Sequence, residues 1–187
     1  MRKLAVKILF PATVVAVVMV VATPALDDLQ SSDEAWDIIR LVDRTELAAR
    51  RFRRDTGRIP IEYGASSADH PHAAKAYHEL SGEQLHQGWR GPYLDHPLTL
   101  ADNPCGGTIE LRRDLELAPA SGFEFGTSDV GSHGPGNYLL LENVSEEVAR
   151  LVDQKFDGSS PDGDWARRGR VEYHPASNRA LCILLVN

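Results

Sequence analysis

The chain begins with a short basic segment that is followed by a long apolar one. Arg2, Lys3 and Lys7 precede an uncharged run from Ile8 to Leu26, and acidic, polar sequence starts directly afterwards. A helix needs about 20 apolar residues to cross the hydrocarbon core of a membrane, and this run is nearly that long. It also fits a signal peptide, because small residues near its end would suit a cleavage site. In both cases we expect the rest of the chain to function outside the cytoplasm.

The charge of the chain argues against nucleic acid as a partner. The formal net charge is −7, and the one basic cluster consists of Arg50, Arg51, Arg53 and Arg54. Nucleic-acid binding normally needs a basic face, which this composition does not predict. We interpret the cluster as the solvated side of a helix. The alternative is a contact with acidic lipid headgroups or with an acidic neighbouring subunit.

An amphipathic helix is predicted after the apolar run. Apolar residues recur at steps of three and four from Ala35 to Phe52, with charged residues between them. Gly57 is a natural C-terminal cap, and Pro60 prevents the helix from continuing. We therefore divide the chain into a membrane anchor or signal segment (1–26), an amphipathic continuation of the long helix (27–60) and a globular domain (61–187).

The globular part is predicted to be loop-rich at first and then to contain a small sheet. Turn-forming residues dominate 61–104, with a possible short helix over 73–80. Alternating apolar residues predict strands over 108–117, 122–125, 138–142, 170–174 and 180–186, and Ser145 caps a predicted helix that follows it. The last strand is nearly continuous in apolar residues and should be central. The predicted fold class is α+β, with one long helix packed on a small antiparallel sheet.

The chain has two cysteines, Cys105 and Cys182, whose spacing is unlike any metal-binding motif. In an exported protein we expect them to form a disulfide between the middle of the chain and its last strand. The alternative is two free, buried thiols.

The motifs in the sequence predict no catalytic site. No GxSxG nucleophile turn and no HExxH zinc motif occurs among the residues, despite seven histidines. An acidic turn contains three closely spaced carboxylates, Asp157, Asp162 and Asp164. Calcium prefers such oxygen ligands, so this turn is the candidate calcium site, although it lacks the full EF-hand pattern. The alternative is a solvated turn.

Two short segments carry recognisable motifs: the helix exit with Asp55, Gly57, Ile59 and Pro60, and residues 88–94. These segments resemble those of pseudopilins, the type IV pilin-like subunits of type II secretion systems. The first is the exit from the long helix, where an acidic residue, a glycine, an apolar residue and a proline follow in the family's order. The second is residues 88–94, GWRGPYL, which match the family's GW-G-PYL element. The resemblance covers most of the chain, and only the second segment is specific. The matching residues are Asp55, Gly57, Ile59, Pro60, Gly88, Trp89, Gly91, Pro92, Tyr93 and Leu94.

The resemblance implies a non-enzymatic structural subunit with a pilin-like fold. One N-terminal helix would span the inner membrane, and the C-terminal domain would lie in the periplasm. The partners would be other pilin-like subunits, in a short filament of a type II secretion or type IV pilus-like machine, with no small-molecule substrate. The interval from Pro24 to Pro60 resembles the family's and favours a retained anchor. The alternative is a monomeric exported or membrane-tethered binding module, stabilised by calcium.

The N-terminus departs from the family pattern. The family is cleaved by a prepilin peptidase before a Phe and a short apolar run that ends in Glu, and no such site is visible here. When the chain is aligned on Pro24, Lys7 stands where the family has that glutamate. In the family, this glutamate is expected to pair with the N-terminus of a neighbouring subunit during assembly. Ordinary processing and ordinary polymerisation are therefore not predicted from this segment.

Overall fold

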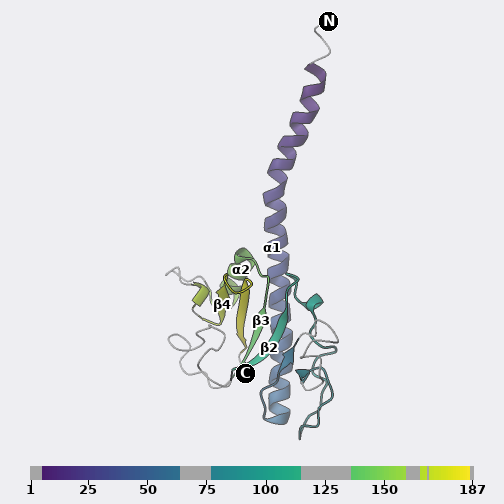
Figure 1. The fold of residues 1–187 in the computed structure, drawn as a ribbon, viewed down its shortest axis with the longest axis vertical. Helices are drawn as coiled ribbons and strands as arrows, with labels where there is room; N and C mark the ends of the chain where they lie inside the picture. Colours follow the sequence, from purple (N-terminus) through teal and green to yellow (C-terminus); the bar gives the residue numbers. More distant parts are fainter. Residues whose placement is uncertain (1–5, 64–76, 115–135, 159–164, 168, 186–187) are drawn as a thin grey trace.

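The computed structural model describes residues 6–63, 77–114, 136–158, 165–167 and 169–185. For residues 6–29 and for Asp114 it describes the backbone alone. The described residues form an α+β fold, as predicted, in which one long helix and one short helix accompany an antiparallel sheet (Figure 1).

The long helix α1 (Val6–Thr56) contains 51 residues. At 1.5 Å per residue it is about 75 Å long. Its C-terminal part lies beside the sheet, and its N-terminal part extends away from the rest of the molecule (Figure 1). Among the described side chains of α1, those that join the core begin at Ala35 and end at Phe52. The predicted amphipathic helix is therefore confirmed.

The sheet contains five strands in the order β1-β2-β3-β5-β4, and every neighbouring pair is antiparallel. The last strand is an inner strand, as its continuous apolar sequence predicted, since it pairs on both sides. The bounds are β1 (Glu62–Tyr63), β2 (Ile109–Asp114), β3 (Gly136–Leu141), β4 (Val171–His174) and β5 (Ala180–Leu185).

Strand alternation divides the buried side chains between the two faces of the sheet. Leu139, Leu181 and Ile183 belong to the main core, which also contains the buried residues of α1. Their neighbours in sequence, Leu140 and Cys182, belong to a second, smaller buried cluster. Successive residues of a strand point to opposite faces, so the two clusters lie on opposite sides of the sheet.

The short helix α2 (Glu146–Phe156) packs against α1 and β4. Ser145 is its N-cap, as predicted, because the Ser145 side chain accepts a hydrogen bond from the Val148 N–H at 3.2 Å. Two short 3-10 helices, η3 (Leu100–Asp102) and η4 (Trp165–Arg167), complete the described elements.

Several predicted elements lie wholly or partly outside the described residues, among them the C-terminal ends of the predicted strands 108–117 and 180–186. The predicted strand 122–125 is not described. Of the predicted helix 73–80, the described residues 77–80 form a turn, in which His78 makes an isolated bridge to Glu62. The sequence did not predict β1, which has only two residues and a buried glutamate.

Candidate functional site

The end of α1 is the region where the motif residues come together. Gly57 has a φ of +69°, and its N–H donates to the carbonyl of Arg53 at 2.7 Å. A left-handed glycine just after the last helical turn satisfies carbonyls that the helix leaves without a partner. Pro60 follows and is buried. The predicted helix exit at Gly57 and Pro60 is confirmed.

Residues 88–94 pack against this helix end. Gly88 has a φ of +83°, and a Cβ placed on it would lie 2.1 Å from the carbonyl oxygen of Asp55. A side chain at this position would therefore collide with the helix backbone. The Tyr93 hydroxyl donates to the Asp55 carboxylate at 3.1 Å and accepts from the Arg90 N–H at 3.0 Å. The Tyr93 hydroxyl thus fastens the segment to the last turn of the helix.

Aromatic packing adds to this attachment. The Tyr93 ring meets Phe52 of the core edge to face, with centroids 5.6 Å apart, and meets Trp89 in the same way at 6.1 Å. A Cβ on Gly91 would lie within 2.9 Å of both the Trp89 and the Tyr93 ring. The peptide bond between Gly91 and Pro92 is cis. Gly88, Trp89, Gly91 and Tyr93 therefore each have a packing role in this segment or at the helix end.

The electrostatics of the helix end favour a charged Asp55. The pKa of Asp55 is lowered, chiefly because Arg54 donates a hydrogen bond to its carboxylate and also because Tyr93 does. The pKa of Tyr93 is raised, first by burial and also by the neighbouring Asp55 charge. The hydroxyl therefore stays protonated and remains a donor to Asp55.

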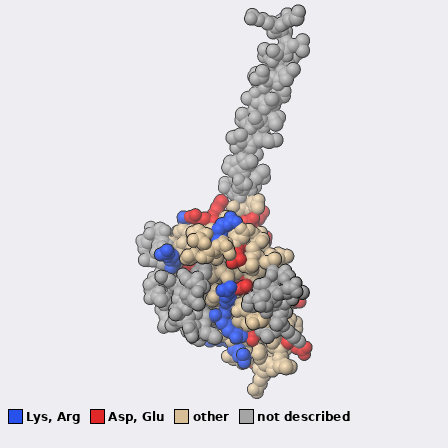
Figure 2. All heavy atoms as spheres, in the orientation of Figure 1, with Lys and Arg blue, Asp and Glu red and all other residues tan. Residues whose placement is uncertain are grey.

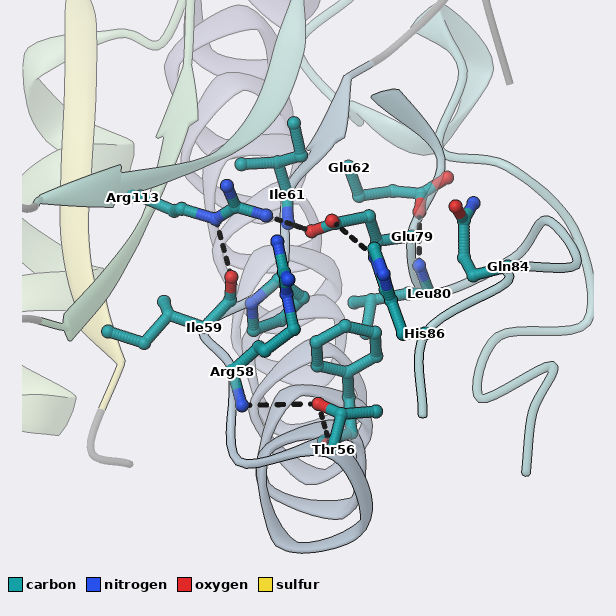
Figure 3. A network of polar contacts seen from close by, with 12 residues as sticks. Thr56, Arg58, Ile59, Ile61, Glu62, Glu79, Leu80, Gln84, His86 and Arg113 are labelled. Atoms are coloured by element: carbon teal, nitrogen blue, oxygen red, sulfur yellow. Dashed lines mark hydrogen bonds and ion pairs between the residues drawn. The ribbon is translucent and has the colours of Figure 1, made fainter. Parts of the chain in front are cut away.

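Beside the helix exit, two buried glutamates organise a polar network (Figure 3). Glu79 accepts from the Ile61 N–H at 2.9 Å, pairs with Arg113 and contacts His86 Nε2 at 3.0 Å. Arg113 also donates to the Ile59 carbonyl. The network thereby ties the chain leaving α1 to β2.

Glu62 is fully buried and has a full set of partners. It accepts from the N–H groups of Leu80 and Ser81, at 2.9 and 3.2 Å, and from the Ser81 hydroxyl. His78 Nδ1 lies 3.0 Å from the same carboxylate. Buried carboxylates are tolerated when hydrogen bonds satisfy them, as they do here.

The Ser81, His78 and Glu62 group does not have the geometry of a nucleophilic triad. In such a triad the hydroxyl donates to an imidazole, and the carboxylate holds the far side of that imidazole. Here the hydroxyl and the imidazole both contact Oε1 of Glu62. The arrangement holds a loop in place, and His78 contacts the carboxylate and not the Ser81 hydroxyl.

Sequence reasoning missed this network because its members look like solvated loop residues. Asn137 is another such member, since its side-chain N–H groups donate to the carbonyls of Pro60 at 2.7 Å and Arg112 at 2.9 Å. Its Oδ1 atom is buried and has no hydrogen-bond partner among the described residues. No local pattern marks a polar residue as buried when its partners come from distant parts of the chain.

The predicted disulfide is not present, and this prediction is corrected. Cys105 and Cys182 are both free. Cys105 packs against the main core, with its Sγ 3.8 Å from the Glu34 carboxylate, whereas Cys182 lies in the cluster on the other face of the sheet. The sheet separates the two thiols. Burial, with the Glu34 charge, raises the pKa of Cys105 to about 11, so that its thiol stays protonated.

The candidate calcium turn is described only at Asp157, because Asp162 and Asp164 lie outside the described residues. Oδ2 of Asp157 accepts from the N–H groups of Arg170 at 2.8 Å and Val171 at 2.9 Å. This carboxylate oxygen therefore anchors the start of β4. Within the described part of the chain, no group of three or more histidine, cysteine or acidic residues could hold a metal ion.

One open depression lies between α1 and η3, with a volume of about 420 Å³. Its walls carry Arg40 and Arg44, and each is already paired with a carboxylate, Asp37 and Asp102 respectively. The depression resembles a groove on a surface more than an enclosed binding pocket.

Comparison with known proteins gives no family for this chain. No protein-family model, no curated protein and no solved structure matches it. Among the described residues, no helix is both long enough and apolar enough to cross a membrane. The side chains of the run Ile8–Leu26, on which the predicted anchor depends, lie outside that description.

Proposed function

We propose that this chain is a non-enzymatic, pilin-like structural subunit. Its N-terminal helix would be held in the inner membrane, and its globular domain would lie in the periplasm. There it would assemble with related subunits into a short filament of a type II secretion or type IV pilus-like machine.

One observation supports the proposal above the others: α1 extends well beyond the domain that packs on its C-terminal part (Figure 1). The part that extends contains the uncharged run Ile8–Leu26, and the described core begins only at Ala35. A long apolar helix without a core to cover it is costly in water, so a membrane or a bundle of like helices is its natural environment.

The helix end adds a second line of support. A subunit that transmits force through its helix needs the domain to be firmly attached to it. Gly88 and Tyr93 provide such an attachment through backbone packing on Asp55 and a hydrogen bond to its carboxylate.

Membrane retention tests the anchor. The full chain should stay in the membrane fraction after alkaline extraction, and its intact mass should include the apolar run. Val17→Glu should release it, because a charge near the bilayer centre costs about 2.5–3.5 kcal/mol. Gln30→Glu, which adds the same charge beyond the apolar run, is the matched control. A soluble species that begins near Thr23 or Leu26 would overturn the proposal.

Crosslinking in cells tests assembly. With Val17→Cys, oxidation should give dimers and longer ladders through neighbouring N-terminal helices. The wild-type chain controls for its native thiols, of which Cys182 is fully buried. A Val17→Cys chain that stays monomeric while retained in the membrane would favour the tethered binding module instead.

A further inference from the structure

The C-terminal end of α1 is strongly basic. Residues 50–58 contain five arginines and one aspartate, for a net charge of +4 in a chain whose net charge is −7. This end of the helix lies opposite to the N-terminus (Figure 1), and in Figure 2 basic side chains form a run along the domain towards that end. The acidic chain therefore concentrates positive charge at the end farthest from its apolar segment.

Part of this charge has no carboxylate partner. Two of the five arginines are paired with carboxylates of α1, and a third lies in the last helical turn, where the helix dipole favours a cation. The remaining two, Arg51 and Arg58, are exposed, and neither makes an ion pair with a described residue. Arg90 is exposed as well, and its charge acts on the Asp55 carboxylate, which already accepts hydrogen bonds from two other side chains.

These arginines lie close to the contact between α1 and residues 88–94. Arg51 and Asp55 are four residues apart, so they share one face of the helix. On that face the Asp55 carbonyl approaches Gly88 so closely that a side chain there would collide with it. Arg58 is the second residue after the helix ends. The cations are therefore grouped around one contact and are not spread along the helix.

The loop that precedes this segment presents a fully exposed leucine, Leu85. Both of its neighbours are held in place. The Gln84 side chain donates to the His78 carbonyl at 3.0 Å, and His86 Nε2 contacts the Glu79 carboxylate at 3.0 Å. A single exposed leucine is common on protein surfaces. This one is fixed between two anchored residues, so that little conformational freedom would be lost when a partner covers it.

Leu85 lies at the same end of the molecule as the arginines. The ring of His86, the next residue, meets the ring of Phe52 in α1, with centroids 6.1 Å apart. The Cα atoms of Leu85 and Gly88 are at most about 11 Å apart, because only three residues separate them. The leucine and the arginines therefore fit within one interface of ordinary size, which buries about 800 Å² of each partner.

The chemistry of this surface indicates a protein partner. From Leu26 to its end, α1 rises about 45 Å. Lipid headgroups extend only about 5–7 Å beyond the hydrocarbon core, and salt screens exposed charges beyond about 8 Å, so the anchoring membrane is out of reach. This step rests on the proposed function. A phosphate polymer would engage the cations and leave the leucine without an apolar contact, whereas a protein segment can supply both carboxylates and an apolar side chain.

We propose that this end of the molecule docks an acidic segment of a different protein. The docking surface consists of Leu85 and the three arginines Arg51, Arg58 and Arg90. Carboxylates of the partner pair with the guanidiniums, whose planar forks match carboxylate geometry, and an apolar side chain of the partner covers the leucine. A second copy of this chain is not the expected partner, because copies anchored in one membrane hold their arginines at the same height.

Selection from a displayed library of random peptides, with the full chain in detergent as the target, tests the docking surface. The enriched peptides should combine several carboxylates with an apolar residue. A labelled peptide of the enriched sequence should bind about tenfold more weakly to Leu85→Ser, and separately to Arg51→Glu with Arg58→Glu. Added salt should weaken its binding to the wild type. A selection without acidic enrichment would overturn the proposal.

Matched variants and a second probe make the test specific. Leu47→Ser removes another exposed leucine, and Arg53→Glu with Arg167→Glu reverses two exposed arginines outside the docking surface. Both controls should bind the peptide as the wild type does, and equal weakening in controls and test variants would contradict the assignment. Heparin is the second probe. If heparin binds the wild type and Leu85→Ser equally while the peptide binds neither, the surface takes polyanions and the protein partner is wrong.

Photo-crosslinking in cells tests the identity of the partner. A benzophenone side chain at position 85 should give a product with a different protein, and Arg51→Glu with Arg58→Glu should remove that product. A product that consists of two copies of this chain would overturn the proposal.

The outcomes separate this inference from the proposed function. If the test variants bind the peptide as the wild type does, and Val17→Cys still forms ladders, the docking surface is wrong and the filament role stands. If the chain is released as a soluble species that begins near Leu26, and peptide binding still depends on Leu85, the filament role is wrong and the docking surface stands.

Discussion

At the scale of single residues, the structure explains several motif positions by the space around them. Gly88 lies so close to the carbonyl of Asp55 that a Cβ has no room, and its φ is positive as well. Gly57 also has a positive φ, but a Cβ on it would meet nothing within 4 Å. Glycine is therefore needed at the two positions for different reasons. At Gly88 the helix backbone leaves no room for a side chain, and at Gly57 the backbone conformation alone favours glycine.

Gly88→Ala should destabilise the domain by about 2–4 kcal/mol, because the helix end and the 88–94 segment must move apart. Gly57→Ala, the matched control, should cost only about 1–2 kcal/mol for the left-handed backbone alone. Urea unfolding of the full chain in detergent measures both. Equal losses for the two variants would contradict the close-approach argument.

Asp153 is a second residue whose environment predicts a measurable effect. It is 5% exposed, and burial, followed by the charge of Asp157, raises its pKa from 3.8 to about 6. A folded-state pKa above the unfolded one means that the folded state holds the proton more tightly. The free energy of unfolding should therefore decrease as the pH rises from about 4 to about 6.

Asp153→Asn should be more stable than the wild type at pH 7.5, by about 1–2 kcal/mol, and equally stable near pH 4. Unfolding curves measured from pH 4 to pH 8 test this. Asp55→Asn should show the opposite sign, since its lowered pKa means that the charged form stabilises the fold above pH 4. A constant difference between Asp153→Asn and wild type across the range would contradict the assignment.

At the scale of elements, the sequence predicted best what local patterns determine. The end of α1, the Ser145 cap and the inner position of β5 follow from periodicity, capping residues and continuous apolar sequence. β1 and the polar network could not be predicted in this way, because Arg113 and Glu79 are separated by 34 residues. The prediction of a disulfide was wrong for a related reason. β5 is apolar on both faces, so its alternation gave no indication that Cys182 points away from α1.

The cap of α2 gives a prediction at this scale. Ser145→Ala removes the acceptor for the Val148 N–H and should cost about 1 kcal/mol. Ser145→Asp should retain most of the stability, because its carboxylate can accept the same hydrogen bond and favours the helix N-terminus. Thermal unfolding of the three chains in parallel distinguishes a capping role from simple loss of packing, which both variants would share.

At the scale of the whole molecule, the helix divides into two parts with different requirements. The described core draws on α1 only from Ala35 onward, and the buried contacts with the sheet and α2 lie in that part. Folding of the domain and attachment to a membrane should therefore be separable properties of one chain.

A chain that begins at Gln30 should fold without detergent, because it keeps every described core residue of α1. Its melting temperature should lie within a few degrees of that of the full chain, and it should no longer be retained by membranes. A chain that begins at Asp43 loses Ala35, Ile38, Leu41 and Val42 from the core and should fail to fold, since each lost large apolar side chain costs about 2–5 kcal/mol. Circular dichroism of both truncations decides the matter. If the longer one is also unfolded, the apolar run is part of the domain's core, and the division of α1 into an anchoring part and a packing part must be abandoned.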